Sequence, residues 1–81
     1  PLYSSAASDV YKRQIGIELE GSDCDVFTDD QYNSLKKLTS LIMKEYDLIT
    51  KDRIKGHSDI APGRKKDPGI LFDWDGYLDN V

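Results

Sequence analysis

The chain has 81 residues and a mass of 9.2 kDa, enough for one small domain that buries only about 60% of the surface its unfolded form exposes. Eleven Lys and Arg against 15 Asp and Glu give a net charge of −4, which argues against a nucleic-acid partner. The single Cys24 forms no internal disulfide, which fits a reducing compartment. No apolar run is long enough for a bilayer core of about 30 Å, so we expect a soluble protein without a membrane partner.

Residues 1–14 (PLYSSAASDVYKRQ) show no helical or alternating apolar pattern and no signal-peptide core. They resemble the translated sequencing-adapter strings found at the ends of reading frames assembled from fragmentary DNA. We therefore interpret residues 1–14 as a non-native, disordered leader, and we expect the true N-terminal part of the protein to be lost before Ile15. A genuine disordered leader is the alternative.

The first regular element is predicted directly after this segment. Ile15, Ile17 and Leu19 alternate with polar residues or glycine, which predicts a strand over residues 15–20 with one apolar face. Glu18 lies on the opposite face. Gly21 and the polar residues after it predict a loop.

A helix start follows at Thr28. Thr28 as N-cap and Gln31 three residues later predict a capping box, and Phe27 with Tyr32 predicts a hydrophobic staple. Apolar side chains then recur every three or four residues, which predicts a helix over residues 29–46 with one face buried against the sheet. The members of this apolar stripe are Tyr32, Leu35, Leu38, Ile42 and Tyr46.

The second half of the chain is rich in loops. The sequence predicts a turn over residues 50–53 and a short strand over residues 54–57. Pro-Gly pairs at 62–63 and 68–69 predict two further turns. Asp73 is placed to cap a last short helix that carries Trp74 and Tyr77.

Candidate chemistry lies in these loops. His57, the only histidine, precedes a turn-rich loop that returns Asp67 ten positions later, so both side chains could bind one zinc ion. A surface or capping histidine gives the same pattern. Lys65 could stabilise an oxyanion beside a metal or belong to a solvated turn. Glu18 is either a general acid/base or a solvent-facing strand residue.

Four motifs together carry a resemblance to a known family. In chain order they resemble the C-terminal half of the AmpD-type zinc amidases, which are N-acetylmuramoyl-L-alanine amidases of the type 2 family and relatives of the peptidoglycan-recognition proteins. The resemblance covers residues 15–74. The motifs are GIELEG (residues 16–21), FTDDQY (27–32), GHSDIAPGRKKDPG (56–69) and FDW (72–74).

The resemblance implies an α/β fold, a mixed β-sheet flanked by helices, of which residues 15–81 are the C-terminal part. It implies a cytoplasmic enzyme of cell-wall recycling whose substrate is an anhydro-muropeptide. The implied reaction is the zinc-dependent hydrolysis of the amide between the lactyl group of anhydro-N-acetylmuramic acid and the L-alanine of the stem peptide.

Residue roles follow from motif position. His57 and Asp67 resemble the second and third zinc ligands, and Glu18 resembles the acidic residue that assists the zinc water. Lys65 resembles the lysine that stabilises the tetrahedral intermediate, and Arg64 is expected to meet anionic groups of the muropeptide. The family's first ligand is a histidine upstream of GIELEG, and His57 is the only histidine here. We therefore hypothesise that the 81-residue chain on its own is inactive.

Three other interpretations stay open at this point. One is a muropeptide-binding module without catalysis, and another is a secreted or phage lytic amidase of the same family. The third is a small adaptor whose motifs match by accident, which the length of the motif at residues 56–69 disfavours. Cys24 has no assignable role.

Overall fold

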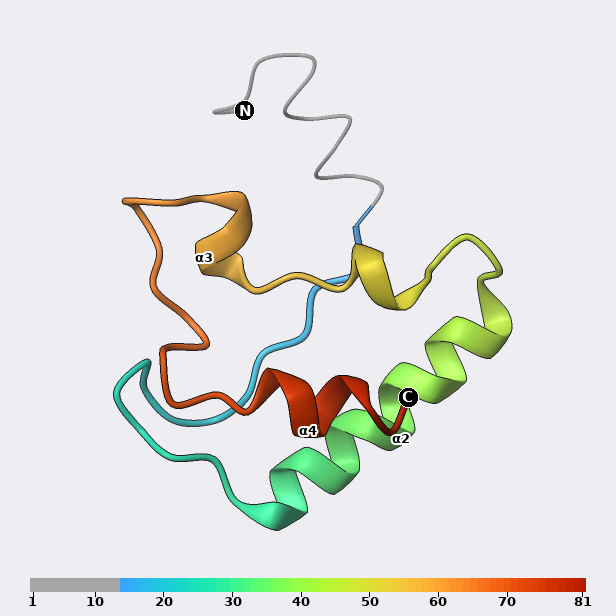
Figure 1. Cartoon of the computed structure of the whole chain (residues 1–81), viewed down its shortest axis with the longest axis horizontal. Helices are drawn as coiled ribbons and strands as arrows, with labels where there is room; N and C mark the ends of the chain where they lie inside the picture. The colour runs from blue at the N-terminus through green and yellow to red at the C-terminus, as the bar shows by residue number, and fades with distance from the viewer. Residues whose placement is uncertain (1–13) are drawn as a thin grey trace.

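The computed structural model describes residues 14–81, so the predicted leader lies almost wholly outside the described residues. The described elements are the helices α2 (Asp29–Glu45), α3 (His57–Ile60) and α4 (Trp74–Leu78) and a 3-10 helix (Lys51–Arg53) (Figure 1). None of the helices in this part of the chain is both long and apolar enough to cross a membrane.

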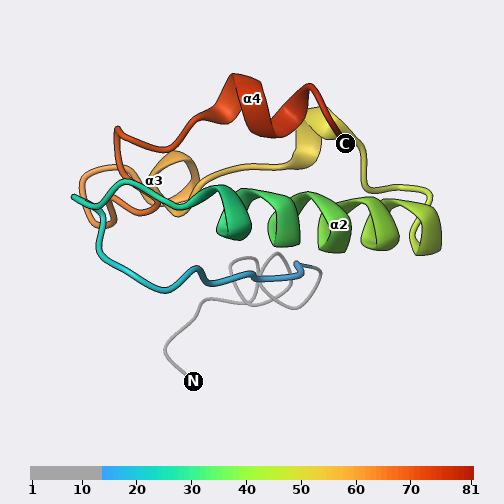
Figure 2. The same cartoon turned by 90° about the horizontal axis from the view of Figure 1, so that it is seen from below.

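Residues 14–81 contain no strand, so the strands predicted at 15–20 and 54–57 do not form, and the described residues supply helices without the expected sheet. A strand needs a hydrogen-bonded neighbour to satisfy its backbone groups. The segment 15–20 has no such neighbour within the described residues, and Ile15 and Ile17 stay 48% and 40% exposed. Leu19 packs against the core. Figure 2 shows this segment on one side of α2 and α4 on the other.

The strand predicted at 54–57 does not form: residues 54–56 have no regular structure, and α3 begins at His57. Gly56 is the N-cap of this helix, and its N–H donates to the Asp59 carboxylate at 3.0 Å. This short-range hydrogen bond offers the backbone an alternative to strand pairing. A local cap therefore decides the conformation at His57.

The start of α2 is as predicted. The N–H of Gln31 donates to Thr28 Oγ1 at 3.1 Å, and the N–H of Thr28 donates to Gln31 Oε1 at 2.8 Å, which completes the capping box. The rings of Phe27 and Tyr32 meet edge to face with centroids 6.4 Å apart, which confirms the staple. The helix ends at Glu45, one residue before the predicted end.

The buried face of α2 is narrower than predicted. Leu35 and Thr39 are buried, but Leu38 is 44% and Tyr46 is 54% exposed. The expected sheet is absent from the described residues, and the short α4 covers the helix instead (Figure 2). A helix of five residues shields only part of the apolar stripe.

An aromatic cluster around Phe72 forms the core. The Phe72 ring lies 4.7 Å from Trp74, 5.6 Å from Tyr77 and 5.7 Å from Phe27, centroid to centroid. As predicted, Asp73 caps α4, because its Oδ1 accepts the N–H of Gly76 at 3.0 Å. The aromatic residues of one C-terminal segment thus hold α2 and α4 together.

Candidate metal-binding site

His57 and Asp67 lie side by side, with His57 Nδ1 3.1 Å from Asp67 Oδ2. His57 is the first residue of α3, and Asp67 follows the loop that leaves this helix. The N–H of Ser58 donates to the carbonyl of Asp67 at 2.9 Å, which ties the returning loop to the helix start. The side chains are 43% and 57% exposed, so both are open to a ligand from solvent.

The donor atoms of this pair suit zinc. Zinc binds His nitrogen and Asp oxygen at about 2.0–2.2 Å, which places two ligands of a tetrahedral ion about 3.3 Å apart. The observed 3.1 Å between Nδ1 and Oδ2 is close to this separation. Within residues 14–81 no group of three His, Cys, Asp or Glu side chains could hold a metal ion. The described part of the chain therefore brings together two side chains of the kind that bind zinc, and no third one beside them.

The other predicted site residues do not join the pair. Arg64 and Lys65 are exposed in the loop after α3, where both backbone N–H groups donate to the carbonyl of Ala61 at 3.1 and 3.0 Å. Glu18 is exposed in the extended segment before α2. Among the described residues, no side-chain hydrogen bond or ion pair links Glu18, Arg64 or Lys65 to His57 or Asp67. Their roles stay predictions.

Sequence reasoning missed the groups that hold the pair in place. Gly56, Ser58 and Asp59 supply the cap of α3 and the hydrogen bond to the returning loop. Glycine is among the favoured N-cap residues and Asp is enriched in the first turn of helices, so Gly56 and Asp59 together could have indicated the start of α3.

Cys24 is exposed and lies outside this site. Its Sγ is 3.5 Å from Asp23 Oδ1, and the hydrogen bond to that carboxylate, with its negative charge, raises the pKa of the thiol. The reactive thiolate is therefore disfavoured at neutral pH.

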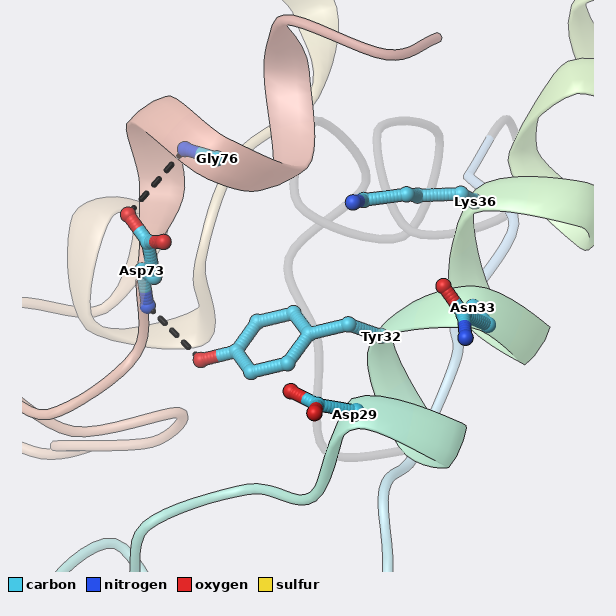
Figure 3. Close-up of a pocket in the computed structure, with 6 residues that line it drawn as sticks. All are labelled: Asp29, Tyr32, Asn33, Lys36, Asp73 and Gly76. Atoms are coloured by element: carbon cyan, nitrogen blue, oxygen red, sulfur yellow. Dashed lines mark hydrogen bonds between the residues drawn. The ribbon is translucent and has the colours of Figure 1, made fainter.

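A separate pocket of about 390 Å³ lies between the first turns of α2 and the start of α4 (Figure 3). Tyr32 Oη accepts the N–H of Asp73 at 2.9 Å, and the Asp73 carboxylate caps α4. None of the predicted site residues lines this pocket, and one of its carboxylates, that of Asp73, is already engaged in capping α4. Its lining residues are Asp29, Tyr32, Asn33, Lys36, Asp73 and Gly76.

Comparison with known proteins places the chain in a family. Residues 4–70 match the N-acetylmuramoyl-L-alanine amidase family. The chain is 64% identical over 67 residues to the 1,6-anhydro-N-acetylmuramyl-L-alanine amidase AmpD of Haemophilus influenzae, which covers 83% of this chain and 36% of that protein. The proteins of the same name from Enterobacter cloacae and Escherichia coli are 55% and 52% identical over 60 residues, 74% of this chain and 32% of each relative.

The chain thus spans about a third of the length of these curated relatives (36% and 32%). No solved structure gives a significant match. The family match covers most of the chain and agrees with the resemblance carried by its four motifs. The chain therefore belongs to the N-acetylmuramoyl-L-alanine amidase family.

Proposed function

We propose that the protein acts as a zinc-dependent amidase on 1,6-anhydro-muropeptides, cutting the amide between N-acetylmuramic acid and L-alanine during cell-wall recycling in the cytoplasm. The name of its relatives, 1,6-anhydro-N-acetylmuramyl-L-alanine amidase, supports this substrate. The observation that carries the proposal is the approach of His57 Nδ1 and Asp67 Oδ2 to 3.1 Å on an exposed surface.

His57 and Asp67 are the residues that would hold zinc. A bound zinc ion supplies Lewis acidity, which polarises an amide carbonyl and makes water a better nucleophile. The Lys65 ammonium is proposed to stabilise the negative charge that develops on the carbonyl oxygen. The Glu18 carboxylate is proposed to accept the proton of the attacking water and to deliver it to the leaving amine of L-alanine.

Arg64 is proposed to recognise the substrate. Its exposed guanidinium stands next to Lys65 in the loop after α3. A guanidinium can bind a carboxylate through two parallel hydrogen bonds. The carboxylates of the stem peptide are the groups it would meet.

The metal site is tested by zinc titration calorimetry on the 81-residue chain. Because each variant removes one of two ligands, His57→Ala and Asp67→Ala are each expected to weaken zinc binding by about tenfold or more. Asp47→Ala is the matched control, because Asp47 is an exposed carboxylate in the turn after α2. Equal zinc affinity in the Asp67 and Asp47 variants would contradict the site.

The activity is tested by chromatography of the stem peptide released from anhydro-muropeptide. The 81-residue chain is expected to release none, because a catalytic zinc site needs three protein ligands and residues 14–81 contain no group of three. A longer protein that contains this chain and spans the whole length of its relatives is expected to release peptide in a zinc-dependent reaction that His57→Ala abolishes. Absence of release by that protein loaded with zinc would refute the amidase function.

A variant of Lys65 distinguishes an amidase from a muropeptide-binding module without catalysis. In an amidase, Lys65→Ala should lower turnover strongly while muropeptide binding persists, because the lysine acts on charge that develops during the reaction. A full-length protein that binds muropeptide without cutting it would favour the binding module instead.

A further inference from the structure

Gly56 stands at the contact between the two segments that carry the proposed ligands. It directly precedes His57, and Pro68 directly follows Asp67. A Cβ atom at Gly56 would lie 2.9 Å from Pro68 Cδ and 3.0 Å from Trp74 Cζ2. A Cβ atom essentially never lies as close to another atom as it would to Pro68, and the distance to Trp74 is also unusually short, so the segments meet here because residue 56 has no side chain.

The requirement at Gly56 is for space and not for an unusual backbone. Its φ of −80° and ψ of 157° suit any residue. Gly56 is buried, its N–H donates to Asp59 Oδ2 at 3.0 Å, and a Cβ would lie 3.4 Å from that oxygen. An added methyl group would therefore meet neighbours on three sides.

One of these neighbours is anchored in the core. The Trp74 ring packs on Phe72 at 4.7 Å and on Tyr77 at 5.9 Å, centroid to centroid. Phe72 and Tyr77 are both buried and Trp74 is half-buried, so the indole behind Gly56 packs against the core. A methyl group at residue 56 would have to displace Pro68, which is bonded directly to Asp67.

We propose that Gly56 is a positioning residue for the His57–Asp67 pair. Its missing side chain lets Pro68 and Trp74 close on the backbone before His57, and this contact sets the distance between imidazole and carboxylate. The relevance to zinc rests on the proposed function, whereas the effect on the pair itself does not.

The test reads the His57 tautomer by ¹⁵N NMR of the 81-residue chain at about pH 9. With Asp67 Oδ2 3.1 Å from Nδ1, the ring is expected to carry its proton on Nδ1 and donate it to the carboxylate. His57 is the only histidine, so its signals need no further assignment. Asp67→Ala serves as the reference for a ring without this partner.

Gly56→Ala is expected to shift the tautomer population from mostly Nδ1–H toward that of the Asp67→Ala reference and to weaken zinc binding about tenfold. Gly16→Ala is the matched control, because a Cβ at Gly16 meets no atom within 4 Å. The amide spectrum shows whether each variant is folded. A folded Gly56→Ala chain with the wild-type tautomer population would overturn the proposal.

If Gly56→Ala does not fold, Trp74→Phe takes its place. This change keeps an aromatic ring beside Phe72 and removes Cζ2, the indole atom nearest Gly56. It should shift the tautomer in the same direction, and an unchanged population would refute the proposal.

Failure of the two ideas is distinguishable. If the wild-type chain binds no zinc but Gly56→Ala still shifts the tautomer population, the metal site is refuted and the positioning role is retained. If Gly56→Ala changes neither the zinc affinity nor the tautomer population, the positioning role alone is refuted.

Discussion

Thr39 and Tyr77 form the buried polar contact between α2 and α4. Their hydroxyl groups are 2.6 Å apart, and the residues are 4% and 3% exposed. A buried hydroxyl that loses its partner costs roughly 1–3 kcal/mol, more than the hydrogen bond contributes on balance. Removing one of the two hydroxyls therefore lowers stability mainly because the other is left buried without a hydrogen-bond partner.

Thr39→Val is expected to lower the free energy of unfolding by roughly 1–3 kcal/mol, because it leaves the buried Tyr77 hydroxyl without a hydrogen-bond partner. Tyr77→Phe should cost less, because the Thr39 hydroxyl can turn to the carbonyl one helical turn before it. In urea denaturation the double variant should lose less than the sum of the two single losses. Strictly additive losses would show that the two hydroxyls do not interact.

Tyr77 also predicts a pH dependence. Burial raises the pKa of its hydroxyl above the usual 10.0, although the hydrogen bond with Thr39 works in the opposite direction. The unfolded chain then loses this proton first, so stability is complete below about pH 10 and falls as the pH rises through the folded-state pKa. Tyr77→Phe should flatten the decline in urea midpoint above pH 10, whereas Tyr46→Phe, at an exposed tyrosine, should not. Equal slopes in the two variants would contradict this assignment.

Elements defined by neighbours in sequence were predictable here, and elements that need distant partners were not. The cap at Thr28, the staple of Phe27 and Tyr32, and the cap of α4 at Asp73 all depend on residues within five positions of one another. The strand predicted at residues 15–20 depends on a neighbouring strand, which residues 14–81 do not contain. Alternation of apolar residues indicates a strand only where such a partner exists.

The same contrast holds for the candidate site. His57 and Asp67 are only ten positions apart, across α3 and one loop, and the structure brings them together. Glu18 lies on a segment far along the chain, and nothing in the local sequence specifies how that segment docks. Its distance from His57 depends on packing that no motif encodes.

The capping box of α2 predicts a clear effect of its first residue. Thr28→Ala removes the acceptor for the Gln31 N–H and should cost about 1 kcal/mol and reduce the helical signal in circular dichroism. Thr28→Ser keeps the acceptor oxygen and should stay within a few tenths of a kcal/mol of the wild-type chain. Similar losses in both variants would mean that the methyl group of Thr28, and not the cap, is what stabilises the helix.

The core of the described chain is small and almost entirely aromatic. Its buried apolar residues are Phe27, Leu35, Phe72 and Tyr77, with no large side chain fully shielded from solvent. The free energy of unfolding of a native domain is roughly 5–15 kcal/mol, and short chains lie at the low end of this range. With so few buried groups, one aromatic ring carries a large share of the total.

Phe72 lies at the centre of the aromatic cluster. Its ring packs against those of Phe27, Tyr32, Trp74 and Tyr77. Phe72→Ala is expected to cost about 3–5 kcal/mol, enough to abolish the near-ultraviolet circular dichroism of the aromatic cluster and the cooperative thermal transition. Ile70→Ala, two residues earlier and 99% exposed, is the control and should leave both signals intact. If Phe72→Ala retained a cooperative transition near the wild-type temperature, the stability of the chain would have to come from contacts outside this cluster.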